Sequence, residues 1–277
     1  YGQSYGEWAE PTEVYITSFK DFASPHPEES TAYVYFMLTE MAEIARILNK
    51  EDDAKRFETY ANKAKYGYQH LIECPKFSLD TNRQAKLVRP LYMHLLDERK
   101  EKYAKERLLK ALDSFDWKLG TGFLSTPFIL YVLEKMNVEY AYRLLENERM
   151  PGWLFMPKMG ANTIWESWEG TEAQGGIASL DHYSKGALLE WIFSRMCGIQ
   201  IKGENEFEIS PVVGGHFTYA GCSYQSVYGL LTSKWEVIGN TIKYHFSIPS
   251  NTKAKIILPN ATYLVGAGEY DYVVEKK

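Results

Sequence analysis

Two tryptophans alternate with two glutamates near the middle of this 277-residue chain, in the run Trp165-Glu166-Ser167-Trp168-Glu169. Aromatic side chains offer flat apolar faces on which a sugar ring can lie, and carboxylates can take up and release protons. Hydrolysis of a glycosidic bond ordinarily needs two carboxyl groups, of which one protonates the leaving oxygen and the other activates water or attacks carbon. The residue types in this run therefore indicate a site for sugar hydrolysis.

Glu166 is the first choice for the reactive carboxylate, because it lies between Trp165 and Trp168, where burial can tune its pKa and position a water. The alternative is that Glu166 and Glu169 are charges at a helix N-terminus or solvated loop acids, and the motif alone leaves both interpretations open. His182, beyond the following loop, is either an imidazole that binds a sugar hydroxyl or a hydrogen-bonded core histidine. Further candidate carboxylates in loops are Glu7, Glu10 and Asp181.

The composition argues against several classes of function. The chain has 31 Lys and Arg against 36 Asp and Glu and no basic stripe interleaved with aromatic residues, so no nucleic-acid partner is expected. No apolar run approaches the ~18 residues of a membrane span. No His, Asp or Glu set has metal-ligand spacing and no phosphate-binding loop occurs, so neither a metal nor a cofactor is expected.

Three cysteines lie far apart in the chain, at Cys74, Cys197 and Cys222. Their odd number and wide spacing fit neither a disulfide framework nor a metal site, so a reducing compartment, the cytoplasm, is predicted. The chain begins at Tyr1, in the middle of what resembles a motif. We therefore expect a fragment of a longer protein, whose own targeting signals this chain does not reveal.

Apolar residues at helical spacing predict pairs of antiparallel helices joined by short links. Pro27 in a first turn, with Glu28 and Glu29 beside the positive helix end, marks the start of the first helix. Pro90 is expected to kink a later helix. The predicted apolar stripe of the first helix comprises Tyr33, Met37, Met41, Ile44 and Leu48. The predicted helices cover residues 27–48 and about 54–71, 81–97 and 99–116, 125–136 and 138–148, and about 180–197.

Long loops separate these helix pairs, over residues 1–27, 74–82, 117–124 and 150–179. We expect the short links at one end of the helices and the long loops at the other, since binding residues commonly lie on loops over a rigid scaffold. The cluster of Glu7, Trp8 and Glu10 in the first loop suits the rim of a cleft. A packed N-terminal loop is an equal alternative.

After Gly198 the hydrophobic pattern changes from helical spacing to short alternating runs. These runs cover residues 207–209, 226–231, 234–237, 241–246 and 254–259. Gly239-Asn240, between two of them, predicts a hairpin turn. The sequence therefore predicts a mainly α chain with a β appendage, with a helical domain over residues 1–198 and a small antiparallel β-sandwich over 199–277.

Four motifs resemble a known family in their order and spacing. They are Gly122-Phe123-Leu124-Ser125-Thr126-Pro127, Pro151-Gly152-Trp153-Leu154-Phe155-Met156, the segment from Gly160 to Trp168, and the segment from Ser179 to Ala187 with Glu190-Trp191. Together they resemble the C-terminal half of the catalytic domain of bacterial α-L-rhamnosidases of glycoside hydrolase family 78, and the resemblance continues through the β appendage. It implies part of an (α/α)6 barrel, an α/α toroid of six hairpins, followed by a C-terminal β-sandwich.

The resemblance also implies a hydrolase of carbohydrate metabolism that releases terminal α-L-rhamnose with inversion. The glutamate of the family's Thr-Ile-Trp-Glu motif, the general base, corresponds to Glu166, and a sugar-contacting histidine corresponds to His182. The family's Gly-Asp-Trp segment corresponds to Gly6-Glu7-Trp8, where Glu in place of Asp lengthens the side chain by one methylene. The expected substrate-binding residues are Glu7, Trp8, Trp153, Trp165, Trp168, Glu169 and His182.

In the family the general acid lies upstream of the Gly-Asp-Trp segment, and no counterpart precedes Tyr1 here, so this chain is expected to be catalytically incomplete. Two alternatives remain open. One is an (α/α)6 glycosidase that acts on another sugar, and the other is a non-catalytic carbohydrate-binding or scaffold protein. Stacked helix pairs whose neighbours are absent would expose an apolar face, so we also expect self-association into a homo-oligomer.

Overall fold

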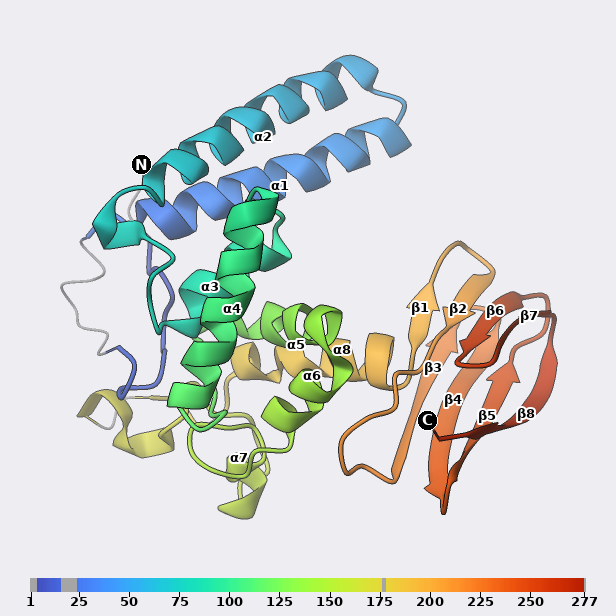
Figure 1. Ribbon diagram of the computed structural model, residues 1–277. Coiled ribbons are helices and arrows are strands. Elements are labelled where there is room, and N and C mark those ends of the chain that lie inside the picture. Colours follow the sequence, from blue (N-terminus) through green and yellow to red (C-terminus); the bar gives the residue numbers. More distant parts are fainter. Residues whose placement is uncertain (1–3, 16–23, 176–177, 277) are drawn as a thin grey trace. The chain divides into compact units, whose positions relative to one another are not determined.

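The helix predicted to start at Pro27 is α1 (Pro27–Ile47) of the computed structural model, which describes residues 4–15, 24–175 and 178–276. Parts of the predicted loops over residues 1–27 and 150–179 lie outside the described residues. α1 pairs with antiparallel α2 (Glu51–Leu71) in a long hairpin, as predicted (Figure 1). Asn49 in the short link has a φ of +56°, in the left-handed region that asparagine tolerates.

Two shorter helix pairs follow, α3 (Gln84–Tyr92) with α4 (Glu98–Ser114) and α5 (Thr126–Met136) with α6 (Val138–Leu145). α3 contains Pro90 and ends earlier than predicted, at Tyr92, since the chain turns at His94, whose φ is +54°. Asp97 caps α4 and Asn137 caps α6, each accepting a bond from a backbone N–H of the first turn at 2.8 and 2.9 Å.

The last helix, predicted over about residues 180–197, is present from Tyr183 to Met196 but is not a regular α-helix. Residues Tyr183–Ala187 form a 3₁₀ turn, α8 spans Leu188–Trp191, and Ile192–Met196 form a π-helical turn. The carbonyl of Lys185 accepts the indole N–H of Trp153 at 2.8 Å, so a tertiary hydrogen bond competes with helical geometry in this segment. Short elements that the sequence did not predict are α7 (Phe155–Lys158) and 3₁₀ turns over Gly170–Gly175 and Pro75–Phe77.

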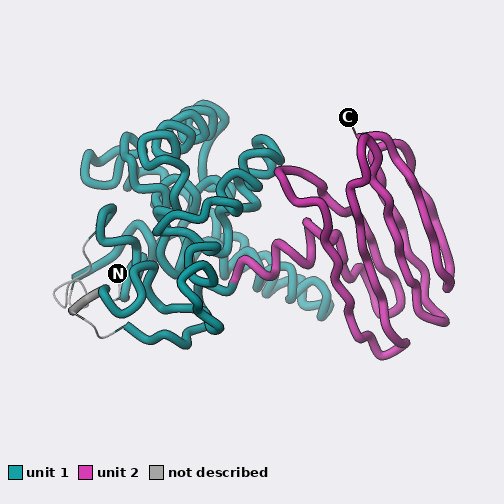
Figure 2. The backbone as a smooth tube through the Cα atoms, turned by 90° about the horizontal axis from the view of Figure 1, so that it is seen from below, with its two compact units in different colours: residues 1–186 teal, residues 187–277 magenta. Residues whose placement is uncertain are grey.

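The chain divides into two units, residues 1–186 and 187–277, shown in teal and magenta in Figure 2. Residues 187–198, which the predicted domain boundary assigns to the helical part, group with the strands in this division. Burial of aliphatic side chains on α3 to α6 stabilises the first unit. Fully buried members of this core are Leu87, Leu108, Leu112, Ile129, Leu133 and Leu144.

α1 departs from its predicted packing. The small residues Ala32, Ala42 and Ala45 are buried, which allows close approach of neighbouring backbone. The predicted stripe is instead largely exposed, at Met37, Met41, Ile44 and Leu48. No helix among the described residues is both long and apolar enough to cross a membrane.

The second unit holds two four-stranded sheets, in the orders β1-β2-β6-β7 and β3-β4-β5-β8. The strands are β1 (Ile199–Ile201), β2 (Glu206–Ile209), β3 (Tyr219–Ser226), β4 (Gly229–Ile238), β5 (Thr241–Ile248), β6 (Lys253–Leu258), β7 (Ala261–Val265) and β8 (Gly268–Glu275). Neighbouring strands are antiparallel except β2 and β6, which are parallel. Alternate residues of β5 and β6 are buried, and the ring of Tyr263 on β7 lies 4.4 Å from that of Tyr272 on β8, so the sheets face each other as predicted.

The turn predicted at Gly239-Asn240 joins β4 and β5 and is confirmed, with Gly239 at a φ of +59°. The run over 226–231, predicted as one strand, is wrong, because the chain reverses within it and Ser226 pairs with Gly229. The Ser226 hydroxyl accepts the Tyr228 N–H at 3.1 Å and donates to the Gly229 carbonyl at 2.8 Å. Local polar bonds therefore place a turn inside an apolar run.

Candidate active site

Glu166 lies in the loop after α7, where two protein donors hold its carboxylate. Oε1 accepts the indole N–H of Trp8 at 3.3 Å, and Oε2 accepts the backbone N–H of Ser179 at 2.9 Å. The backbone N–H of Glu166 donates to the Ser179 carbonyl at 2.9 Å, which fixes the residue from its main chain as well. The side chain remains partly exposed. The structure thus holds this carboxylate in one orientation while leaving it accessible.

The segment around Trp8 is fastened to the loop before α5. The N–H of Phe123 donates to the Trp8 carbonyl at 2.8 Å. The two backbones approach so closely that a Cβ on Gly122 would lie 2.2 Å from the Trp8 carbonyl oxygen. Glycine at position 122 is therefore required for this contact.

Glu7 anchors the same two loops from inside the protein. Its Oε1 accepts the backbone N–H groups of Gly122 and Ser125 at 2.9 and 2.8 Å, and its Oε2 accepts the Ser125 hydroxyl at 2.8 Å and a bond from Arg89. Arg89, fully buried on α3, also pairs with Glu28 at 2.6 Å. Both oxygens of Glu7 are engaged by these donors, so the carboxylate holds the loops together.

Two more acids tie the N-terminal segment down. Glu10 is buried and forms two bonds with Arg83, one of them at 3.2 Å. Glu169 accepts the backbone N–H of Thr12 at 2.7 Å and its hydroxyl at 3.0 Å through the same oxygen. Three of the long loops predicted to share one end of the helices, over residues 1–27, 117–124 and 150–179, therefore meet through contacts of residues 7–12.

The four predicted tryptophans fall into two pairs. Trp153 and Trp168 are buried, with their rings packed edge to face at 5.9 Å between centroids. Their indole N–H groups donate to backbone carbonyls, at 2.8 Å for Trp153 and 2.7 Å for Trp168. Trp8 and Trp165 are partly exposed. Two of the four rings are thus accessible near Glu166, and the other two are buried.

His182 lies next to the strand-like segment that carries Glu166. Its backbone N–H donates to the Ile164 carbonyl at 2.8 Å. This bond joins the same two segments as the backbone bond between Glu166 and Ser179. The imidazole stacks on Phe123 at 4.9 Å between centroids. Nδ1 accepts the N–H of Ser184 at 3.3 Å, so the proton of the neutral ring is expected on Nε2.

Several residues of this arrangement were not found from the sequence. Arg83 and Arg89 lie on or beside a short helix whose apolar spacing carries no signal for a buried cation. Lys185 belongs to the last motif but has no sequence feature that predicts its burial. The residues that the structure describes contain no cluster of three or more His, Cys, Asp or Glu side chains able to hold a metal ion.

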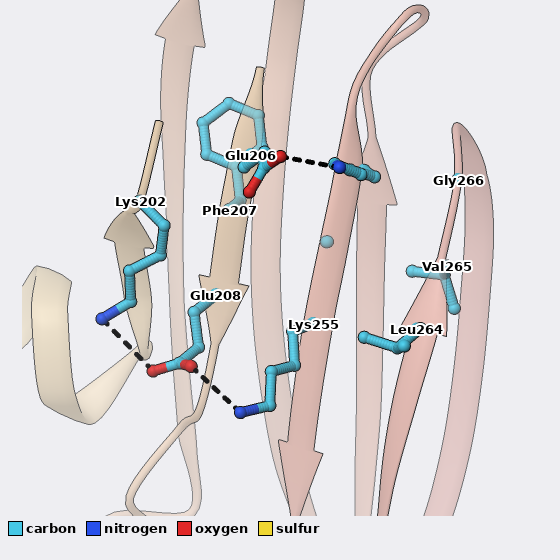
Figure 3. Close-up of a pocket in the computed structure, with 10 residues that line it drawn as sticks. Lys202, Glu206, Phe207, Glu208, Lys255, Leu264, Val265 and Gly266 are labelled. Atoms are coloured by element: carbon cyan, nitrogen blue, oxygen red, sulfur yellow. Dashed lines mark ion pairs between the residues drawn. The ribbon is translucent and has the colours of Figure 1, made fainter. Parts of the chain in front are cut away.

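A separate hollow of about 510 Å³ lies on the β1-β2-β6-β7 sheet of the second unit. Its charged side chains pair with one another, Glu208 with Lys202 and Lys255 at 3.4 and 3.6 Å, and Glu206 with Lys253 at 2.6 Å (Figure 3). No tryptophan or tyrosine lines it. Its carboxylates are neutralised by lysines, so this surface is a weaker candidate for sugar chemistry than the site around Glu166.

Comparisons with known proteins agree with this architecture. Residues 1–196 match the family model described as the bacterial alpha-L-rhamnosidase 6 hairpin glycosidase domain, and residues 201–271 match the bacterial alpha-L-rhamnosidase C-terminal domain. The fold and the first match place residues 1–196 among six-hairpin glycosidase domains. The chain belongs to the bacterial α-L-rhamnosidase family.

Relatives with this name are considerably longer. An alpha-L-rhamnosidase of Formosa agariphila is 30% identical in an alignment that covers 88% of this chain and 29% of that protein. The structure of an alpha-L-rhamnosidase from Dictyoglumus thermophilum superimposes with a TM-score of 0.85 at 25% identity, over 99% of this chain and 34% of that one. The Streptomyces avermitilis alpha-L-rhamnosidase, solved in complex with L-rhamnose, gives a TM-score of 0.82 at 26% identity, over 98% and 28%. The chain therefore spans about a third or less of these relatives.

Proposed function

We propose that this chain is part of an α-L-rhamnosidase that hydrolyses terminal α-L-rhamnosyl groups with inversion and that Glu166 is its general base. The observation that carries the proposal is the placement of the Glu166 carboxylate, held by Trp8 and Ser179 yet partly exposed. A carboxylate has about four lone-pair positions, so one donor on each oxygen leaves room for a water. Glu166 takes a proton from that water while the water attacks the anomeric carbon on the face opposite the leaving oxygen.

Substrate binding is assigned to the accessible members of the predicted set. Trp8 and Trp165 provide ring faces for the sugar, and Nε2 of His182 donates to a hydroxyl, while Glu169 lies at the rim beside Thr12. Glu7, Trp153 and Trp168 support these residues from behind, because their polar atoms are already bonded to protein groups.

The general acid is proposed to come from a part of the protein outside these 277 residues. Glu7 and Glu10 are buried in ion pairs with Arg89 and Arg83, so neither is free to protonate a leaving oxygen. In an inverting enzyme the acid stands about 6.5–9.5 Å from the base, which leaves space for the water. Asp181, which is exposed, is a further loop carboxylate, and Asp181→Asn tests it directly.

The test uses the full-length protein that contains this chain, with an aryl α-L-rhamnoside as substrate. Glu166→Gln keeps the shape of the side chain and removes the base, so we expect the rate to fall about 10²–10⁴-fold with folding intact. Glu172→Gln, an exposed acid in the same loop, is the matched control and should leave the rate unchanged. Proton NMR of the first product should show the inverted anomer.

Four outcomes would redirect the proposal. A retained anomer would remove Glu166 from the role of base in an inverting reaction. An active Glu166→Gln variant would move that role to Glu169. A wild-type protein that binds L-rhamnose without hydrolysing aryl rhamnosides would favour the carbohydrate-binding alternative, and activity on a different glycoside would change the sugar.

Self-association and a reducing compartment are also proposed. Met37, Met41 and Ile44 on α1 leave apolar surface exposed, which favours contact between copies of the isolated chain. Light scattering should detect an oligomer, and Ile44→Glu should shift it toward monomer. The thiols of Cys74, Cys197 and Cys222 are free in the structure, which is consistent with a reducing compartment such as the cytoplasm.

A further inference from the structure

Lys185 is a buried cationic side chain that the reaction outlined above does not use. It lies on the 3₁₀ turn Tyr183–Ala187 and has no solvent exposure. Its Nζ donates to the carbonyl oxygen of Ala9 at 2.9 Å and to that of Thr121 at 3.3 Å, across 176 and 64 residues of sequence. One amine thereby joins three segments that are far apart in the chain.

Two aromatic rings enclose this amine. Nζ lies 4.6 Å from the ring centroid of Trp168 and 5.2 Å from that of Phe123, within the range of a cation–π attraction. Trp168 donates its own N–H to the same Thr121 carbonyl at 2.7 Å, and Phe123 stacks on His182 at 4.9 Å. Lys185 therefore contacts the ring that supports His182 as well as the ring behind the proposed site.

The backbone of Ala9 is strained, so the hydrogen bond to its carbonyl matters for the conformation of this turn. Ala9 has a φ of +54°, in the left-handed region that residues with a Cβ seldom adopt. Such a conformation persists only where the surrounding contacts hold it, and the bond from Lys185 is one of them. Ala9 directly follows Trp8, whose indole bonds to Glu166. The orientation of the Trp8 ring thus depends on the backbone turn at Ala9, which Lys185 stabilises.

The charge state of this amine is sensitive to its enclosure. Burial lowers the pKa of Lys185 to about 7, against the opposing effect of the acids Glu7, Glu10, Glu169 and Glu166. Two of these acids lie on the N-terminal segment and two on the loop after α7. Among the described residues none of them forms an ion pair with Lys185, so they act at longer range. The amine therefore changes its charge close to neutral pH.

We propose that Lys185 is a positioning residue, which joins the carbonyls of Ala9 and Thr121 and so sets the placement of Trp8 against Glu166. It acts through Trp8 and touches none of the groups assigned to the reaction. The expected change in kcat/KM rests on the proposed function. The expected change in amide hydrogen exchange is independent of that function.

The variant to test in the full-length protein is Lys185→Met, which keeps the length of the side chain and removes its donors. We expect kcat/KM on an aryl α-L-rhamnoside to fall about tenfold or more, because small misplacements of catalytic groups are costly. We also expect faster amide exchange in residues 8–10 and 121–123, including the Phe123 N–H that bonds to Trp8. Lys158→Met, which alters an exposed lysine on α7, is the matched control and should change neither measurement.

Wild-type protein alone supplies a third measurement, which remains available if Lys185→Met does not fold. The pKa of Lys185 is about 7 in the closed segment and returns to its ordinary value of 10.5 when the segment opens. At a pH between these two pKa values, opening therefore takes up a proton. Exchange protection of residues 8–10 and 121–123, corrected for intrinsic rates, should therefore rise as the pH increases from about 7 toward 10. In Lys185→Met this rise should disappear.

The inference would be overturned if amide-exchange protection of these residues did not depend on pH in the wild type. Wild-type exchange and a wild-type pH–rate profile in a folded Lys185→Met variant would overturn it as well. If the wild type hydrolyses no rhamnoside but both exchange results are as expected, the proposed function fails and the positioning role of Lys185 stands.

Discussion

The indole N–H of Trp8 donates to Oε1 of Glu166 at 3.3 Å, across 158 residues of sequence. This contact joins the N-terminal segment to the loop after α7 and places a partly exposed ring beside the proposed base. A hydrogen bond to a charged group contributes about 1.5–3 kcal/mol when its partners are well placed. The pair is therefore a direct point at which to test the site.

Trp8→Phe keeps an aromatic ring and removes the donor. We expect kcat/KM on an aryl α-L-rhamnoside to fall about tenfold or more in the full-length protein, because the Glu166 carboxylate loses a charge-assisted hydrogen bond. Tyr5→Phe is the control, since it keeps the ring that packs edge to face on Trp8 at 5.9 Å. Equal kcat/KM in wild type and Trp8→Phe would show that the donor is dispensable.

Gly122→Ala should separate the two loops that carry the site. The added Cβ would lie 2.2 Å from the backbone carbonyl of Trp8, so a main chain has to move. We expect a loss of about 1–3 kcal/mol in the free energy of unfolding, measured by urea denaturation, together with reduced activity.

Gly67→Ala is the matched control for that substitution. Gly67 lies within α2 and a Cβ there meets nothing within 4 Å, so alanine should stabilise the helix by about 0.5–1 kcal/mol. A Gly122→Ala variant as stable as Gly67→Ala would contradict the close backbone contact.

Arg89→Met should be strongly destabilising. It would leave the carboxylates of Glu7 and Glu28 buried without their cation, and breaking a buried pair in this way typically costs about 3–5 kcal/mol. Arg46→Met, which breaks the exposed pair with Glu58, should cost about 0–1 kcal/mol. Similar losses in the two variants, measured as free energies of unfolding, would show that the Arg89 cluster is not a structural centre.

Tyr68 should make the protein sensitive to alkaline pH. Burial, together with the charge of Glu28, raises the pKa of Tyr68 well above 10, while in the unfolded chain it ionises near 10. The unfolded state therefore loses a proton that the folded state keeps, and stability should fall as the pH rises above about 10.

Tyr68→Phe should weaken that alkaline dependence. At neutral pH it should cost about 1.5–3 kcal/mol, because the buried 2.7 Å hydrogen bond from its hydroxyl to the Glu28 carboxylate is lost. Tyr66→Phe, at an exposed position on the same helix, should change neither quantity. An unchanged alkaline limb in Tyr68→Phe would assign that dependence to other groups.

Much of the fold could be predicted because it is encoded locally. The helix pair of α1 and α2 follows from apolar spacing and from Pro27 and the acids of the first turn, all within a few residues of one another. The turn at Gly239-Asn240 likewise needs only two residues that tolerate positive φ. One failure has the opposite cause, because in the segment after His182 the Lys185 carbonyl accepts a bond from the distant indole of Trp153. The other failure is local: the chain reverses at Val227 and Tyr228 inside an apolar run, where the Ser226 hydroxyl bonds to Tyr228 and Gly229.

The site divides along the same line. The sequence by itself determined the helix hairpins, the change to strands after Gly198, and the motif in which Glu166 lies between aromatic residues. Only the tertiary structure decided that Trp8 reaches Glu166, that Trp153 and Trp168 are buried while Trp165 is accessible, and that Arg89 and Lys185 become buried cations. Helical and strand periods depend on neighbours a few residues away, whereas burial and hydrogen bonding depend on groups brought together across more than a hundred residues, which no local pattern records.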